Sequence, residues 1–425
     1  MSTPRNSSTK TQTIRTLGVL ERYFWLLDQQ RPTHFTMVAE ITGTASVAEW
    51  RQGLAAIQQI HPLLAVSIQL NENNAPAFVT HSGTLIPLKV VKNTNETAWV
   101  TALEHEIVQR FNSTAAPLIR AVIYEYQNQS VIALIAHHAI SDGRSMTFVF
   151  RDLLNAMNGK YGIPHNMPPS MDAYTDLPEN AVGQIPASEA DILLFKQQPP
   201  TAGPNPQIRL MELSSELTQQ VIKRSKQEGT TVHGTLCAAL VLASKAWKPN
   251  PMRIQSAISL RETLGMDETS CASILGRIVP FDIDTIGSFW DIARYAKETL
   301  AGANSMQDVT AFANRFCLML QNGLNVPGVG ELVDTARASE YLISNIGVLT
   351  FGSDFGKFKL NSMWGPFAVT GYEGNQGLGV VTVNGSIRMM LTSLAHTHVK
   401  PVLELMEQIL SMECALVNYV PQQSN

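Results

Sequence analysis

The sequence predicts a mixed α/β protein made of two comparable lobes that face each other across a cleft. Patterns typical of helices alternate with patterns typical of strands in both halves of the 425-residue chain. Between residues 159 and 206, nine prolines interrupt all regular periodicity, so we place the boundary between the lobes there. No repeat of fixed period is visible. The halves share only a similar mixture of elements.

In the first half, Leu20, Phe24 and Leu27 recur at helical spacing and predict the first helix. The next helix ends at His61-Pro62, because proline disfavours helical backbone at the residue before it. The predicted helices span residues 17–27, 50–60, 99–111 and about 145–157. Apolar runs and alternation predict strands at residues 63–70, 118–126 and 130–138.

The second half begins with a predicted strand and ends with a predicted helix. Its predicted helices span residues 214–228, about 233–247, 290–301 and 399–416. Its predicted strands span residues 207–213, 252–259 and 278–283, with several short strands in the glycine-rich stretch 344–384. The expected domain organisation is a flexible N-terminus at 1–15, an N-terminal lobe at 16–175, a proline-rich linker at 176–206 and a C-terminal lobe at 207–425.

Composition excludes several classes of protein. The 31 basic and 35 acidic residues give a net charge of −4, whereas nucleic-acid binding needs a basic surplus. The longest apolar stretches, 131–136 and 236–243, are far shorter than the roughly 20 residues that span a bilayer. The first 15 residues lack the apolar region of a secretory signal. Four isolated cysteines indicate neither a disulfide framework nor a zinc knuckle, which favours a reducing compartment. Because the apolar stretches are short, we expect a soluble protein, and we place it in the cytoplasm.

One segment combines residue types that carry chemistry: His137-His138-Ala139-Ile140-Ser141-Asp142-Gly143, between an apolar strand and an amphipathic helix. Neighbouring strand residues point to opposite faces, which disfavours a metal site made of both histidines. One imidazole therefore faces the cleft, where it can act as a general base. Asp142 can orient the loop and Gly143 allows close approach of the backbone. A capped turn without catalytic function is the alternative reading of this pattern.

Other motifs predict no cofactor or metal. The glycines at 374, 377 and 379 have the wrong spacing for a dinucleotide site, and residues 352–357 are one residue short of a phosphate-binding loop. His396 and His398 have no cysteine or carboxylate beside them, so we expect them to be solvated rather than to bind a metal.

The segment resembles the HHxxxDG signature of the condensation-domain superfamily of CoA-dependent or carrier-protein-dependent acyltransferases. The resemblance covers nearly the whole chain in the order of the family's landmarks. The segments of this chain that resemble the landmarks are residues 20–27, His61-Pro62-Leu63-Leu64, residues 231–236, Ser259-Leu260-Arg261, Ser344-Asn345-Ile346-Gly347 and Asp354-Phe355-Gly356. Lys357 and Phe358 replace the Trp-Gly of the plant-type DFGWG motif, which argues against a plant-type member.

This resemblance implies two chloramphenicol-acetyltransferase-like lobes in a V shape, with the active site in a tunnel between them. The chain looks most similar to stand-alone acyltransferases of the phthiocerol dimycocerosyl transferase and alcohol acetyltransferase type. By the same resemblance, His138 is the base and the acyl group passes directly to the acceptor, which fits the absence of a GxSxG elbow.

The resemblance also implies supporting roles. Asp142 is expected to be structural and ion-paired with an arginine, with Arg261 as the first candidate and Arg277 as the second. Gly143 is expected to lie near the developing oxyanion, either donating its N–H or making room. Ser344 and Asn345 are expected to bind the tetrahedral intermediate or the acceptor. His137 is expected to pack or to orient the loop.

The expected function is acyl transfer from a CoA or carrier-protein thioester to an alcohol, in lipid, polyketide or other secondary metabolism. The thioester is a substrate, and no other cofactor is expected. An acyl carrier protein or a polyketide synthase is a candidate partner, and we expect a monomer. Two alternatives stay open: amide formation on an amine, and a catalytically silent module that docks carrier proteins.

Overall fold

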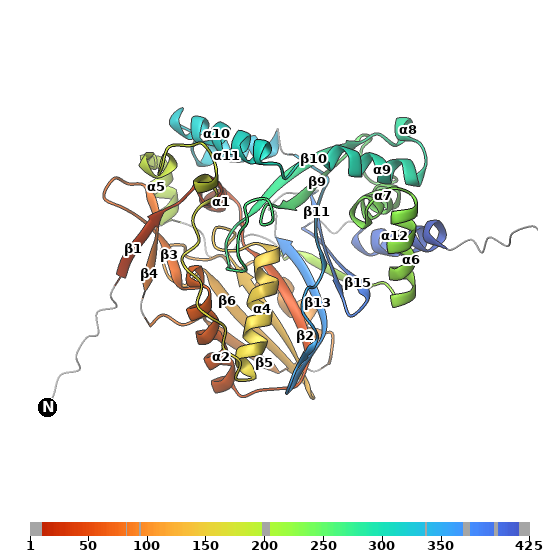
Figure 1. Ribbon diagram of the computed structural model, residues 1–425, viewed down its shortest axis with the longest axis horizontal. Helices are drawn as coiled ribbons and strands as arrows, with labels where there is room; N and C mark the ends of the chain where they lie inside the picture. Colours follow the sequence, from red (N-terminus) through yellow and green to blue (C-terminus); the bar gives the residue numbers. More distant parts are fainter. Residues whose placement is uncertain are drawn as a thin grey trace, which may run out of the picture.

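The computed structural model describes residues 11–81, 83–92, 95–197, 205–335, 338–368, 375–394 and 398–415. In these ranges the chain forms two six-stranded sheets and one three-stranded sheet, with helices packed around them (Figure 1). The predicted mixed α/β class is thereby confirmed. No helix in these ranges is both long enough and apolar enough to cross a bilayer. Gly374 and His396, at which we expect no cofactor or metal, lie outside the described residues.

The first six-stranded sheet forms the centre of the N-terminal lobe and has the order β12-β13-β2-β7-β6-β5. Its strands are β2 (Phe35–Thr42), β5 (Leu88–Lys92), β6 (Ile119–Tyr126), β7 (Gln129–Ala136), β12 (Asp354–Phe355) and β13 (Phe358–Ala368). β7 is a central strand, antiparallel to both neighbours. Residues 130–136 are all buried, so both faces of β7 are covered, which explains its uninterrupted apolar sequence.

Two strands of this sheet come from the C-terminal half of the chain. β13 pairs antiparallel with β2, with Lys359 opposite Thr42 and Ala368 opposite Phe35. The sheets therefore do not follow the predicted division into lobes at 16–175 and 207–425. Local patterns predict that a segment is a strand, but the choice of a partner more than 300 residues away depends on tertiary packing.

The second six-stranded sheet belongs to the C-terminal lobe and has the order β10-β9-β11-β14-β15-β8. Its strands are β8 (Gln207–Glu212), β9 (Met252–Ser259), β10 (Ile274–Phe281), β11 (Tyr341–Val348), β14 (Gln376–Val383) and β15 (Ser386–Ser393). Helices α6 (Ser215–Gln227), α7 (Val232–Ser244), α8 (Ile283–Ile286), α9 (Phe289–Leu300) and α12 (Val399–Cys414) gather beside it, at the right of Figure 1. α7 packs against α6, α9 and α12, which explains its strongly apolar sequence.

Among the described residues, four α-helices from the first half of the chain belong to the N-terminal lobe, and two of them begin at a capping side chain. They are α1 (Val19–Gln30), α2 (Val47–Ile60), α3 (Ala98–Glu106) and α4 (Gly143–Met157). Ser46 and Glu49 form a capping box at the start of α2, and Asp142 caps α4. α10 (Met306–Gln321) and α11 (Val326–Asp334), which were not predicted, pack against α1 from the second half of the chain (Figure 1).

The three-stranded sheet corrects the predicted N-terminus. β1 (Thr11–Thr16) pairs with β4 (Pro76–His81), which also pairs with β3 (Val66–Leu70). The expected flexible segment 1–15 is therefore wrong for residues 11–15, and residues 1–10 lie outside the described part. Arg15 forms a two-pronged ion pair with Glu21, at 2.6 and 2.7 Å, that ties β1 to α1. The short helix η1 (Pro62–Ala65) replaces the start of the strand predicted at 63–70.

The proline-rich linker predicted at 176–206 contains regular structure, namely η3 (Val182–Gln184) and α5 (Glu189–Lys196). Another short helix, η2 (Met171–Tyr174), lies just before it. Buried Asp191 of α5 accepts a hydrogen bond from the backbone N–H of Val326 at 2.8 Å. This contact joins the linker to the start of α11, so α5 forms part of the packed structure.

Candidate active site

A cavity of about 1030 Å³ lies where the two halves of the chain meet. The HHxxxDG segment occupies the connection between the end of β7 and the start of α4 at one wall of this cavity. Five of the predicted site residues line the cavity: His138, Gly143, Arg261, Ser344 and Asn345. His137 and Asp142 are fully buried outside its lining.

The hydrogen bond of the His138 ring defines its tautomer. Nδ1 lies 3.0 Å from the carbonyl oxygen of Ser141. Because a carbonyl oxygen can only accept, Nδ1 carries the proton and Nε2 keeps its lone pair. Nε2 has no hydrogen-bond partner within the described ranges, so it is available to a substrate in the cavity.

Two aromatic rings hold the His138 imidazole in place. Phe24 of α1 stacks on one side at 4.5 Å between ring centroids, and Phe35 at the start of β2 stacks at 4.4 Å. Burial lowers the pKa of His138 from 6.5 to about 4, and the attraction of the Asp142 carboxylate only partly offsets this effect. The imidazole is therefore uncharged at neutral pH.

His137 faces away from the cavity. Its Nδ1 accepts a hydrogen bond from the backbone N–H of Ala139 at 3.1 Å, and its Nε2 lies 3.5 Å from Oδ2 of buried Asp28. Burial alone would raise the pKa of Asp28, but His137 and Arg110 hold it well below its usual range. Since Asp28 belongs to α1, His137 links the end of β7 to the helix that carries Phe24.

Asp142 does not form the expected ion pair. Its Oδ1 accepts from the backbone N–H of Ser145 at 2.7 Å, and its Oδ2 accepts from the backbone N–H of Ser273 at 2.9 Å. Among the described residues, no arginine forms an ion pair with Asp142, whose carboxylate binds backbone N–H groups. Arg261 instead donates to the Oγ of Ser145 at 2.6 Å and to the carbonyl of Thr269 at 3.1 Å. The guanidinium therefore reaches Asp142 only through Ser145.

The segment 269–273, which the sequence reasoning missed, closes over the HHxxxDG loop. The Oγ of Ser270 donates to the carbonyl of Ile140 at 3.0 Å, and the Oγ of Ser145 donates to the carbonyl of Cys271 at 2.8 Å. Together with the bond from Ser273 to Asp142, these contacts fix the loop that positions the Ser141 carbonyl. No local motif signals this role, because the segment contributes mainly backbone atoms and small polar side chains.

Gly143, the first residue of α4, is required by close packing. A Cβ atom there would lie 2.6 Å from Cγ of Pro366 and 2.8 Å from Cδ1 of Ile346. Pro366 belongs to β13 and Ile346 to β11, so the glycine lets the second half of the chain approach the start of α4. Ser344 and Asn345 lie on β11 across the cavity, and Asn345 Oδ1 accepts from the N–H of Gly347 at 2.9 Å.

Comparison with known proteins identifies the family. The family described as Condensation domain matches residues 22–309, which include the HHxxxDG segment and most of the cavity lining from α1 and α4. The chain belongs to the condensation-domain family. Its family and fold support an acyl-transfer or condensation function, and more generally a transferase.

Similar proteins span several kinds of enzyme. A linear gramicidin synthase chain of Brevibacillus parabrevis is 22% identical over 337 residues, which cover 69% of this chain but 6% of that protein. The structure of trichothecene 15-O-acetyltransferase TRI3 from Fusarium sporotrichioides has a TM-score of 0.69 at 12% identity, covering 98% of this chain and 97% of the other. Polyketide synthase associated protein 5 from Mycobacterium tuberculosis has a TM-score of 0.62 at 15% identity, covering 95% and 98%. At these identities the likeness to the two structures shows the fold alone.

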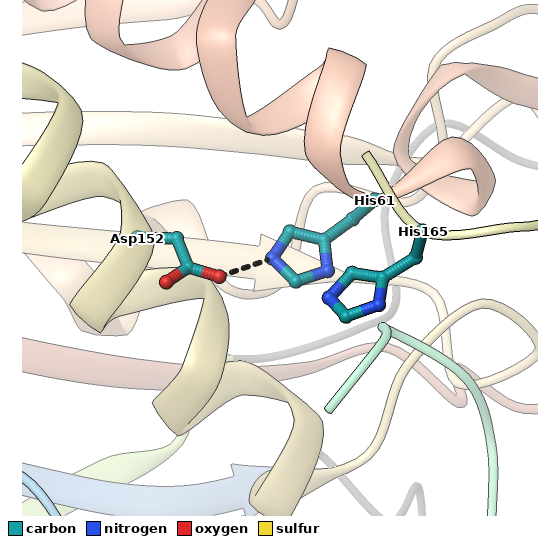
Figure 2. Close-up of side chains that lie close together, drawn as sticks. All are labelled: His61, Asp152 and His165. Carbon is teal, nitrogen blue, oxygen red and sulfur yellow. Dashed lines mark hydrogen bonds and ion pairs between the residues drawn. The ribbon is translucent and has the colours of Figure 1, made fainter. Parts of the chain in front are cut away.

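A second cluster of titratable side chains lies near the site but outside the cavity lining (Figure 2). Within the described ranges, His61, Asp152 and His165 bring potential metal-binding atoms within 4.8 Å of one another. In Figure 2 the His61 ring points at Asp152, with His165 beside it; the rings of the two histidines are 5.4 Å apart. The residue types alone would suit a zinc ion.

The hydrogen bonds of His61 argue against a metal in this cluster. The backbone N–H of Ser270 donates to Nδ1 at 3.2 Å, so the proton of the neutral ring lies on Nε2, which donates to Asp152 at 3.1 Å. A metal ligand needs a free nitrogen lone pair, and neither nitrogen offers one. Asp152 also accepts from Arg151 at 2.8 and 3.2 Å. His61 therefore connects Asp152 of α4 to Ser270 of the segment 269–273, and this segment contacts the HHxxxDG loop.

Proposed function

We propose that this protein transfers an acyl group from a CoA or carrier-protein thioester to an alcohol and so forms an ester. The observation that carries the proposal is the state of His138: an uncharged ring whose Nδ1 proton is held by Ser141, leaving the Nε2 lone pair at the cavity. A neutral imidazole with a fixed tautomer is suited to take a proton from an acceptor hydroxyl. The family, with its acyl-transfer and condensation activities, supports the same chemistry.

In the proposed reaction, the hydroxyl oxygen attacks the thioester carbonyl carbon while its proton moves to Nε2 of His138. The new C–O bond gives a tetrahedral intermediate with a negative oxygen. This intermediate collapses, the C–S bond breaks, and the leaving sulfur takes the proton back from Nε2. The products are an ester and a free thiol, and the ring is neutral again.

The start of α4 is the proposed binding place for the negative oxygen. The first N–H groups of a helix have no acceptor within the helix, and this end carries the positive end of the helix dipole. Asp142 occupies the N–H of Ser145, while Gly143 lies at the cavity surface. Ser344 and Asn345 face this region from β11 and are proposed to contact the acceptor or the intermediate.

An alcohol fits the surroundings of the base better than an amine. Phe24 and Phe35, the rings that flank His138, carry no charge. Most aliphatic amines are protonated at neutral pH and have to lose a proton before their nitrogen can attack a thioester. A hydroxyl group is already neutral and needs only His138 to take its proton.

The donor can be free CoA or a carrier protein, since both present a thioester on the same pantetheine arm. The similarity to a gramicidin synthase and to a polyketide synthase associated protein supports carrier-protein donors. We propose a place in lipid, polyketide or other secondary metabolism on this basis. The monomer and the cytoplasmic location stay predictions from the sequence.

The test is thiol release from a panel of acyl-CoAs and acyl-loaded carrier proteins, each with and without alcohols and amines. We expect alcohol-dependent release that falls about 10²- to 10⁴-fold in His138→Ala, as loss of a general base does. His105→Ala, which removes an exposed histidine of α3, is the matched control and should keep full activity.

Imidazole rescue distinguishes a base from a structural histidine. His138→Ala leaves a slot between Phe24 and Phe35 that free imidazole can enter, so added imidazole should restore part of the activity. Full alcohol-dependent release by His138→Ala would refute the assignment of the base. Release that depends on amines rather than alcohols would show amide formation instead.

A further inference from the structure

A continuous run of aromatic rings leads from the base to α10. The run begins at His138, whose ring contacts Phe24 at 4.5 Å. Phe24 then meets Tyr23 at 5.5 Å, edge to face. Tyr23 meets Phe316 of α10 at 5.7 Å, and Phe316 stacks on Phe312 at 6.1 Å. The rings connect residues almost 300 positions apart in the sequence, because α10 packs against α1 (Figure 1).

Part of this run faces the cavity. Phe24, Tyr23 and Phe312 line it, and we call these three residues the aromatic wall. Phe316 is buried behind them with 3% of its surface exposed. Leu20 and Val333 also belong to the apolar lining of the cavity. The wall therefore offers a cavity surface about three rings wide, backed by a packed core.

Another part of the cavity lining carries charged side chains. Arg253 of β9 and Glu340, which line it there, form an ion pair at 2.7 Å, and Lys248 lies beside them. The aromatic wall itself contains no cation that could pair with a phosphate. A phosphorylated arm is thus disfavoured on the wall, because a buried charge needs a partner. These rings suit an uncharged, apolar group.

We propose that the aromatic wall binds the apolar group of one substrate, an alkyl chain or an aromatic ring, and that Phe312 sets the size of group that is accepted. This proposal rests on the proposed acyl transfer, since it deepens the substrate class of the same site. The wall starts at the base, so a group bound to it presents its reacting end to Nε2 of His138. The group belongs either to the acyl donor or to the acceptor, since both meet at His138.

Phe312 sets the size of the accepted group because it is the last ring of the run and lines the cavity. It is half-buried, whereas Phe316 makes the contact with Tyr23 that packs α10 onto α1. Removing the Phe312 ring therefore enlarges the cavity and leaves the helix contact in place. Each methylene buried against the wall should strengthen binding about fourfold, until the group reaches this ring.

The first experiment measures kcat/KM in two series. One varies the acyl-CoA from acetyl to palmitoyl with a fixed alcohol, and the other varies the alcohol from ethanol to hexadecanol with a fixed donor. In one series, wild-type kcat/KM should rise about fourfold per methylene and then fall at a limiting length. Phe312→Ala should move that limit to longer chains and lower kcat/KM for the former best chain about tenfold. The series that responds identifies the substrate that lies on the wall.

Leu318→Ala is the matched control, because Leu318 lies on the same helix but is 57% exposed to solvent. It should leave both series unchanged. If Phe312→Ala also left both series unchanged, or if Leu318→Ala altered them equally, the proposal would be wrong.

A binding measurement separates this proposal from the proposed function. The probes are an unreactive thioether analogue of decanoyl-CoA and decanol, titrated calorimetrically into His138→Ala protein, which retains the wall. One probe should bind, and its affinity should fall about tenfold when Phe312→Ala is added. Such a loss of affinity would support binding of the apolar group at the aromatic wall even if His138→Ala left acyl transfer intact. Equal binding with and without the Phe312 ring would overturn the proposal whatever the fate of the base.

Discussion

Asp142→Ala should unfold more easily than the wild type because it removes two acceptors at once. The carboxylate caps α4 through the N–H of Ser145 and holds the N–H of Ser273 from the second half of the chain. Loss of the helix cap costs about 1–2 kcal/mol. Leaving the buried N–H of Ser273 without an acceptor costs about 1–3 kcal/mol more. The free energy of unfolding should therefore fall by about 2–5 kcal/mol, a large part of the roughly 5–15 kcal/mol of a typical domain.

Urea unfolding, followed by tryptophan fluorescence and circular dichroism, measures this change as a lower midpoint at an unchanged slope. Asp282→Ala is the matched control, because Asp282 also caps a helix but does so at the surface of α8. It should lose at most about 1 kcal/mol. A midpoint for Asp142→Ala equal to that of the wild type would refute the reasoning.

Asp142→Asn separates the observed hydrogen bonds from an ion pair. The amide oxygen can still cap α4, but its NH₂ group cannot accept from Ser273, so the expected loss is about 1–3 kcal/mol. An ion pair with a buried arginine would instead make Asp142→Asn as damaging as Asp142→Ala, at about 3–5 kcal/mol, because both strand the charge. An intermediate midpoint for Asp142→Asn is therefore the result that the structure requires.

Two further predictions concern the site. Because the pKa of His138 is lowered from 6.5 to about 4, kcat/KM should stay level as the pH falls through 6.5 and decline only toward pH 4. The unfolded protein takes up this proton near pH 6.5, so the free energy of unfolding should decrease as the pH falls from 6.5 to about 4. His34 and His233 should add to this decrease, because burial also lowers their pKa values to about 4. A rate profile with its midpoint at 6.5 would contradict this account. Gly143→Ala should lower stability by about 1–3 kcal/mol and reduce turnover, since its Cβ would collide with Pro366. Gly352→Ala, in open space, is the control, and equal thermal midpoints for the two variants would contradict the packing argument.

Sequence patterns were sufficient for the elements that bracket the site. The apolar run of β7 and the amphipathic pattern of α4 place HHxxxDG at a strand-to-helix connection. His137 and His138 point in different directions, as expected, but β7 ends at Ala136, so both lie in the loop after the strand rather than in the strand predicted at 130–138. These properties are local, because each depends on residues within a few positions of one another.

Contacts between distant segments could not be predicted in this way. β13 enters the first sheet, and the segment 269–273 closes over the HHxxxDG loop, although neither carries a local signal for its partner. The same cause explains the wrong expectation for Asp142: a charge in a loop suggests an arginine, while the structure supplies backbone N–H groups from another segment. At residues 11–15, a polar sequence suggested flexibility, but pairing with β4 orders them.

The sequence by itself determined the mixed α/β class and the HHxxxDG segment, because periodicity and motif spacing depend on neighbouring residues, and the resemblance to the family indicated His138 as the candidate base. Only the tertiary structure decided the chemical state of that base. The Ser141 carbonyl selects the His138 tautomer, burial against Phe24 and Phe35 lowers its pKa, and α10 adds Phe312 to the two rings of α1 in the aromatic wall. Tautomer, pKa and substrate surface depend on groups brought together from several elements, so packing sets them.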